Sequence, residues 1–208
     1  MVSTELKKLT VGLLHTNTYI LLREDIAVVI DPGTVNNEEI EDIMNIIGDR
    51  RVSAVICTHG HYDHVCGAVY LNAEKYYIHR RESIILEDSS WWAENFYKSP
   101  LSLPEKFDYL EGGEILNFNG IKLEIIHTPG HSPGSICILS KELNALFTGD
   151  TLFKGTHGRT DFKGGSVRDM LETLKKFLEM DDSLTIYPGH GDISTLGEEK
   201  KWIRNLYL

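Results

Sequence analysis

The sequence ICTHGHYDHVCG, residues 56–67, places three histidines and an aspartate within six consecutive positions, at His59, His61, Asp63 and His64. Formation of an ordinary turn does not require so many imidazoles. The preceding run, VSAVICT, is short and continuously apolar, which is typical of a strand covered on both faces. Residues two apart in an extended loop point the same way, so His59 and His61 can bind one metal ion together. Asp63 and His64 continue past that ion and can reach a second one.

Three further histidine or aspartate motifs also follow predicted strands. HTPGHSPGS contains His131, NALFTGD ends on Asp150, and LTIYPGHG contains His190. Layered α/β folds bind their ligands at the carboxyl ends of strands, so these glycine-containing loops are expected to converge. One such histidine alone would indicate packing or a turn, but the recurrence favours a metal site. Imidazole and carboxylate donors suit Zn, Fe or Mn, and Asp150, isolated after Gly149, is the residue expected to bridge two ions.

Composition excludes several classes of partner. The 208 residues carry 21 Lys plus Arg against 31 Asp plus Glu, a formal net charge of -10. This charge repels nucleic acids and anionic membranes, so neither is an expected partner, and a small-molecule substrate is expected instead. The N-terminal sequence lacks the features of a secretory signal, and the apolar runs are too short to span a bilayer. The three cysteines form no C-x-x-C pair, which indicates no disulfide framework and favours a cytoplasmic protein. The sequence does not indicate an oligomeric state.

The chain contains no repeat and no low-complexity linker, so we predict a single domain over residues 1–208. Strand patterns alternate with helical ones in both halves, as in helices predicted over 36–48, 64–75 and 166–179, and this alternation predicts a layered α/β fold. Residues 88–110 break the pattern with two prolines and paired tryptophans. They predict a long loop, either a lid beside the substrate or a structural cover.

The motifs together resemble those of the metallo-β-lactamase superfamily of hydrolases. The pattern His59-x-His61-x-Asp63-His64 is followed by TPGHS, FTGD and PGHG in the family's order, and the likeness extends over nearly the whole chain. The resemblance implies a four-layer αβ/βα sandwich with a dinuclear site at one edge. It implies a first metal held by His59, His61 and His131, a second held by Asp63, His64 and His190, and Asp150 in contact with both. Asp31, in VIDPG, is expected to orient the loop or to cap a turn.

Within the superfamily, DTLFKGTHGRTDFKGG resembles the compact glyoxalase-II-like branch and the related persulfide dioxygenases. The likeness implies that Arg159, His157 and Asp161 bind substrate, although an Arg159–Asp161 pair with a structural role is the alternative. This sequence differs from the glyoxalase II pattern in two features that bear on glutathione recognition. Asp192 stands where a tyrosine usually follows the last histidine ligand, and little sequence follows PGHG for the additional helical domain of full-length glyoxalase II. The resemblance therefore implies thioester hydrolysis and leaves the acyl group and the thiol open.

These inferences predict a hydrolase that uses two divalent ions, with Zn expected and Fe or Mn as alternatives. The pair of metals would lower the pKa of a bridging water to about 7, and the resulting hydroxide would attack a thioester carbonyl. Asp63 would accept a hydrogen bond from the hydroxide and keep it aimed.

Three other hypotheses remain open from the sequence. A persulfide dioxygenase of this fold would use one iron, and the resemblance matches its ligands to His59, His131 and Asp150. A lactone or phosphoester hydrolase would use the same hydroxide in a different pocket. A binding module would hold a closed structural metal, and its removal would unfold the protein.

Overall fold

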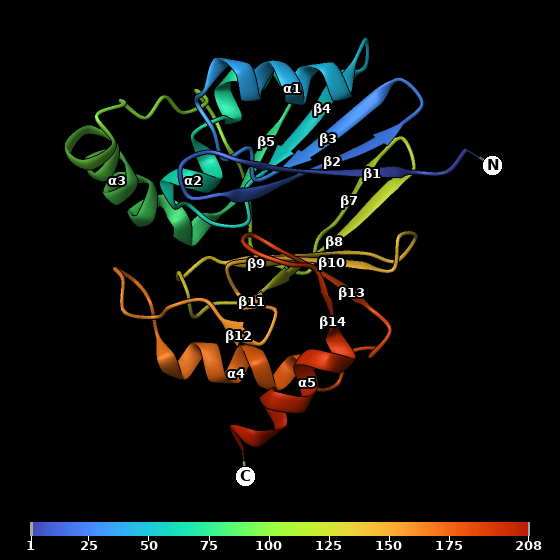
Figure 1. The fold of residues 1–208 in the computed structure, drawn as a ribbon, viewed down its shortest axis with the longest axis vertical. Helices are drawn as coiled ribbons and strands as arrows, with labels where there is room; N and C mark the ends of the chain where they lie inside the picture. Colours follow the sequence, from blue (N-terminus) through green and yellow to red (C-terminus); the bar gives the residue numbers. More distant parts are fainter. Residues whose placement is uncertain (1, 208) are drawn as a thin grey trace.

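In the computed structural model, which describes residues 2–207, two mixed β-sheets pack face to face and helices cover both outer surfaces (Figure 1). The first sheet has the order β1-β2-β3-β4-β5-β6. Its strands are β1 (Glu5–Val11), β2 (Thr16–Arg23), β3 (Ile26–Ile30), β4 (Arg51–Ile56), β5 (Tyr76–His79) and β6 (Asp108–Leu110). The pairs from β3 to β6 are parallel, so their carboxyl ends meet at one edge.

The second sheet has the order β14-β13-β10-β9-β8-β7. Its strands are β7 (Ile115–Phe118), β8 (Ile121–His127), β9 (Ile136–Ser140), β10 (Ala145–Gly149), β13 (Thr185–Pro188) and β14 (Ser194–Thr195). A small hairpin of β11 (Leu152–Phe153) and β12 (Thr156–His157) follows β10. Because β10 and β13 are parallel, the loops after them leave the same edge of the sheet.

The helices divide between the two outer faces (Figure 1). The first sheet is covered by α1 (Asn37–Ile47), α2 (Tyr62–Val65), the 3₁₀ turns η1 (Ala68–Leu71) and η2 (Arg80–Glu82), α3 (Ser83–Trp92) and the π-helical turn η3 (Ala93–Tyr97). The second sheet is covered by α4 (Val167–Phe177) and α5 (Leu196–Asn205). This order of layers, helices–sheet–sheet–helices, confirms the predicted four-layer sandwich.

The strand sequences explain the layers, because alternate side chains of one strand enter different cores. In β3, Ile26, Val28 and Ile30 face the second sheet, whereas Ala27 and Val29 pack under the first group of helices. Three apolar clusters result: one between the sheets and one beneath each helical layer. Burial of β3 and β4 on both faces confirms the reading of VSAVICT as a doubly covered strand.

Side-chain caps set where the long helices begin. Asn36 accepts hydrogen bonds from the backbone N–H groups of Glu38 and Glu39 at the start of α1. Ser166 accepts one from Asp169 N at the start of α4. Such caps satisfy N–H groups that have no partner within the helix.

Two local predictions were wrong. The helix predicted over 64–75 is interrupted at Gly67, where the backbone approaches the preceding loop so closely that a Cβ would lie 2.5 Å from Pro32 O. The predicted loop over 88–110 is helical as far as Tyr97, because both of its prolines come later in the sequence.

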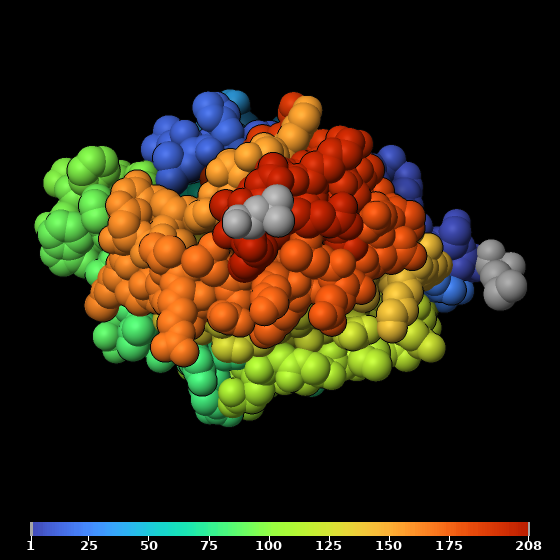
Figure 2. All heavy atoms as spheres, turned by 90° about the horizontal axis from the view of Figure 1, so that it is seen from below, coloured from blue at the N-terminus to red at the C-terminus, as the bar shows by residue number. Residues whose placement is uncertain are grey.

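From below, α4 and α5 form most of the visible face, and the end of α3 projects at its side (Figure 2). Among residues 2–207, no helix has the length and apolarity needed to cross a membrane.

Candidate metal centre

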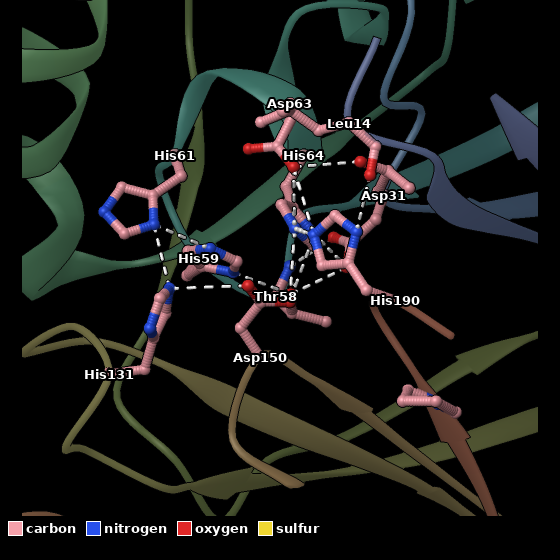
Figure 3. Close-up of polar contacts among 12 residues, drawn as sticks. Leu14, Asp31, Thr58, His59, His61, Asp63, His64, His131, Asp150 and His190 are labelled. Atoms are coloured by element: carbon pink, nitrogen blue, oxygen red, sulfur yellow. Dashed lines mark hydrogen bonds and ion pairs between the residues drawn. The ribbon is translucent and has the colours of Figure 1, made fainter. Parts of the chain in front are cut away.

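All seven side chains expected to bind metal converge at the edge where strands of both sheets end (Figure 3). His59, His61, Asp63 and His64 follow β4, and the loop between β8 and β9 carries His131. Asp150 follows β10 and His190 follows β13. The structure therefore brings together residues separated by as many as 131 positions in the chain, from 59 to 190.

The first group consists of His59, His61 and His131, whose ring nitrogens lie close together. His61 Nδ1 is 3.1 Å from His59 Nε2 and 2.9 Å from His131 Nε2. Nitrogens bound at 2.0–2.1 Å to one tetrahedral ion would be about 3.3 Å apart, so this spacing fits a shared ion. His131 Nδ1, the other ring nitrogen, is 2.8 Å from Arg159 O and donates its proton there.

The second group consists of Asp63, His64 and His190. His190 Nε2 lies 3.2 Å from Asp63 Oδ2 and 3.3 Å from His64 Nε2. The outer nitrogen of His190, Nδ1, is held 3.1 Å from Leu14 O. The hydroxyl of Thr16 donates to Asp63 Oδ2 at 2.9 Å. The contact with Leu14 O orients the ring of His190 and leaves its Nε2 available to a ligand, and the bond from Thr16 orients the Asp63 carboxylate.

Asp150 lies between the two groups (Figure 3). Its Oδ2 is 3.6 Å from His131 Nε2 in the first group. Its Oδ1 is 3.4 Å from His64 Nε2 and 3.6 Å from His190 Nε2 in the second. Among residues 2–207, Oδ1 is buried without a hydrogen-bond partner. A buried carboxylate oxygen normally has a partner, so this atom suits a bound cation.

Asp31 orients the site and is not an isolated turn cap. Its buried carboxylate accepts hydrogen bonds from Thr58 N and Thr58 Oγ1, both at 2.7 Å. His64 Nδ1 lies 2.9 Å from Asp31 Oδ2, so the carboxylate directs His64 Nε2 toward Asp150. Asp31 adopts a left-handed backbone conformation, with φ of 50°. Such backbone strain in a residue other than glycine is commonly found at functional sites.

Glycines allow the close approach of two loops. Gly149, with φ of 47°, places its backbone where a Cβ would lie 2.3 Å from Thr58 Oγ1. At Gly189 a Cβ would lie 2.4 Å from Asp150 Oδ1. A larger residue at position 149 would therefore displace Thr58, and one at position 189 would displace Asp150.

Sequence reasoning missed Glu82, a buried carboxylate that connects two ligand-bearing loops. Its Oε2 accepts a 2.6 Å hydrogen bond from Gly60 N, between His59 and His61. Its Oε1 accepts bonds from Ser132 Oγ at 2.7 Å and Gly134 N at 2.6 Å, just after His131. Glu82 belongs to no motif, and only the unusual burial of a glutamate reveals its role.

Electrostatics keep three of the candidate ligands, His59, His61 and Asp63, in the protonation states that metal binding requires. Burial lowers the pKa of His59 well below its usual value and that of His61 to about 4, so both are neutral at pH 7. Burial alone would raise the pKa of Asp63, but the neighbouring His64 and His190 hold it well below its usual range. Although burial opposes it, the surrounding carboxylates Asp63, Asp31 and Asp150 raise the pKa of His64. These carboxylates favour a positive charge at this position, and a metal ion bound there would displace the proton from His64.

The three residues predicted to bind substrate are not all at the site. Arg159 and Asp161 line a cavity of about 1090 Å³ that opens over the candidate ligands. They also pair with each other through two 2.7 Å contacts, as the structural alternative expected. His157 does not line this cavity, because it lies in β12 with its ring beside Trp202, 6.2 Å between centroids.

A family model for the metallo-beta-lactamase superfamily matches residues 11–190. The chain belongs to this superfamily. Membership implies divalent-metal binding and supports a metal-dependent hydrolase with a small-molecule substrate.

Among relatives in the superfamily, the hydroxyacylglutathione hydrolase GloC of Haemophilus influenzae is 34% identical over 182 residues, covering 84% of each chain. The crystal structure of the BLEG-1 B3 metallo-beta-lactamase has a TM-score of 0.82 and 30% identity, covering 95% of this chain and 97% of that one. TTHA1623, solved in a di-iron-bound form, has a TM-score of 0.80 and 28% identity, covering 94% and 97%.

Proposed function

We propose that this protein hydrolyses a thioester with the help of two divalent ions held around Asp150. The observation that carries the proposal is the position of this carboxylate, whose two oxygens face two separate groups of ligand-type side chains. Two nearby cations repel each other, and a carboxylate with one oxygen for each offsets that repulsion. A single ion would leave one of the groups without a role.

We assign one ion to His59, His61 and His131, the other to Asp63, His64 and His190, and Asp150 to both. The residues fit such ions because Asp150 Oδ1 is buried without a hydrogen-bond partner among residues 2–207. Imidazole and carboxylate donors without thiolate suit Zn, with Fe and Mn as alternatives. The di-iron-bound form of TTHA1623 supports testing iron.

When bound, such ions would lower the pKa of a bound water to about 7 and polarise a carbonyl oxygen. The Asp63 carboxylate is ionised and held by Thr16. We propose that it accepts a hydrogen bond from the attacking water and aims it at the carbonyl carbon. The water adds to that carbon, the C–S bond breaks, and a carboxylic acid and a thiol are released. Because a thiolate is a weak base, its departure requires no acid residue.

The relatives define the test panel. GloC, named as a hydroxyacylglutathione hydrolase, supports thioester hydrolysis, whereas BLEG-1 requires that β-lactams be included. The protein is loaded with Zn, Fe or Mn, its metal content is measured, and lactoyl thioesters, lactones, phosphoesters and a β-lactam are offered. We expect two ions per chain and release of free thiol from a thioester. Turnover of another ester class or the β-lactam, with every thioester left intact, would refute the proposal.

A persulfide dioxygenase remains the rival function, with one iron held by His59, His131 and Asp150. It would leave Asp63, His64 and His190 without a role, although these three form a group of their own. Oxygen consumption with a persulfide separates the two functions, because thioester hydrolysis consumes no oxygen. One iron per chain together with oxygen uptake would favour the dioxygenase.

A further inference from the structure

The cavity over the candidate centre is lined by two chemically different kinds of side chain. The first kind are candidate ligands, among them His61, Asp150 and His190. The second kind are aromatic residues, namely Tyr62, Trp91, Trp92, Tyr97, Phe153 and Phe162. Two of these rings lie beside candidate ligands, Phe153 against His190 and Phe162 against His61. A group attached to the scissile bond would therefore lie against aromatic rings.

Several of these rings are exposed although they could bury large apolar areas. Trp91 is 57% exposed, Phe162 43% and Trp92 37%. Isolated exposed aromatic residues are ordinary, but a contiguous group beside a polar centre is typical of a binding surface. Phe162 also packs edge-on against the candidate ligand His61, with 5.9 Å between ring centroids, so the surface reaches the reaction site.

Local structure holds the aromatic rings in place. The π-helical turn η3 after α3 brings Tyr97 onto Tyr62, and the two rings stack 4.6 Å apart with an angle of 8° between their planes. Trp92 packs edge-on against Trp91 and donates a 3.1 Å hydrogen bond from Nε1 to Asp88. Turns of π-helix are frequent at functional sites, and rings fixed before binding lose little entropy when a ligand arrives.

The cations that line the cavity are already paired. Arg159 contacts Asp161, and its guanidinium lies 3.7 Å over the Phe162 ring. Lys163 pairs with Asp88 at 3.6 Å, joining the segment after β12 to α3. These pairs compensate the positive charge at the rim. A substrate with several carboxylates would find little net attraction there, whereas a neutral apolar group would fit.

We propose that this aromatic surface binds a bulky apolar group, preferably an aromatic ring, carried by the substrate next to its scissile bond. The inference rests on the proposed thioester hydrolysis and specifies its substrate class. The group belongs either to the acyl part or to the thiol part of the thioester. Both present the same chemistry to the rings, and the experiment distinguishes them.

The test compares thioesters that differ in one group at a time. Acetyl and phenylacetyl thioesters of N-acetylcysteamine vary the acyl side, and the acetyl thioester of phenylmethanethiol varies the thiol side. Rates are corrected for each compound's alkaline hydrolysis. We expect kcat/KM to rise at least about tenfold when a phenyl group is present on the preferred side, mainly through a lower KM.

Variants locate the effect on the surface. Trp91→Ala and Trp92→Ala should each reduce by about fivefold the kcat/KM advantage of the preferred phenyl-bearing thioester over the acetyl thioester of N-acetylcysteamine. Tyr109→Ala is the matched control, because Tyr109 is an exposed aromatic residue on β6, against Arg80 and outside the cavity. It should leave both rates unchanged. Equal loss of this advantage in the control would overturn the assignment.

Binding without turnover provides a second measurement. A ketone in which a methylene replaces the sulfur of the phenylacetyl thioester should quench tryptophan fluorescence at a lower concentration than its acetyl counterpart. If no thioester is hydrolysed but the ketones still differ, the proposed function fails and the aromatic subsite stands. If thioesters are hydrolysed without regard to the phenyl group, or a glutathione thioester is strongly preferred, the subsite inference is overturned.

Discussion

At the scale of single residues, Asp150 is the group on which the proposed centre depends most. Its carboxylate lies within 3.6 Å of nitrogens in both ligand groups, and Gly149 and Gly189 allow the backbone to come close enough. An uncharged amide at this position would keep the shape but supply only one weak oxygen donor. Loss of the Asp150 carboxylate should therefore weaken the binding of both ions together.

We predict that Asp150→Asn lowers the metal content from two ions per chain to one or none and abolishes turnover. Metal analysis after dialysis and a thiol-release assay measure the two effects. Asp161→Asn is the matched control, because Asp161 lines the same cavity but pairs with Arg159 and with no candidate ligand among residues 2–207. It should retain both ions. A fully metallated Asp150→Asn protein would exclude the bridging assignment.

His79 shows how a histidine outside the centre influences stability. The buried ring stacks 4.2 Å from His127, its Nδ1 accepts a bond from Arg81 N, and its Nε2 lies 3.2 Å from Glu111 O. Burial and the neighbouring His127 lower the pKa of His79 below its usual 6.5. Below pH 6.5 the unfolded chain therefore binds a proton that the folded protein resists.

We predict that the free energy of unfolding of the His79→Gln variant, compared with that of the parent protein, changes less unfavourably as the pH drops from 7 to 5.5. The contribution of one group is at most about 1.4 kcal/mol per pH unit. Urea titrations at several pH values, with chelator present in both proteins, measure the difference. Parallel pH profiles for the two proteins would contradict the assignment.

At the scale of elements, the ligands are positioned by loops that are tied to one another. Glu82 in η2 joins the loop after β4 to the loop between β8 and β9, one from each sheet. The carboxylate accepts three hydrogen bonds while fully buried. An amide would turn its NH₂ group toward at least one backbone N–H and break part of this link.

We therefore predict that Glu82→Gln weakens metal affinity by about 10- to 100-fold, as is typical when a partner behind the ligands is changed. Competition with a chromogenic chelator measures the affinity directly. Glu87→Gln, on the exposed side of α3, is the control and should leave affinity unchanged. If Glu82→Gln lowered thermal stability without changing metal affinity, its role would be structural only.

At the scale of the whole molecule, the candidate centre lies at an edge of the sandwich and not within its cores. The three apolar clusters contain none of the seven candidate ligands. The fold should consequently persist without metal, although bound ions stabilise the native state in proportion to their affinity.

Removal of metal with a chelator should abolish hydrolysis while leaving the near-UV circular dichroism nearly unchanged. Thermal unfolding should remain cooperative at a lower Tm, and added Zn or Fe should restore activity. Loss of the folded state upon chelation would instead indicate a closed structural site.

The features that could be predicted from the sequence alone are those encoded by residues close together in the chain. The apolar run before His59, the cap at Ser166, and the spacing of His59 and His61 depend on residues a few positions apart. Strand-end motifs even indicated which distant residues would meet, since parallel strands deliver their loops to one edge.

The contacts that cross between elements depend on the packing of the layers. The tertiary structure interrupted the helix at Gly67, where the backbone packs against Pro32, and continued α3 into the aromatic surface. It joined Glu82 to two ligand loops and left His157 outside the cavity. Such contacts depend on how the layers pack, and no local period or propensity encodes the partner of a buried side chain that lies tens of residues away.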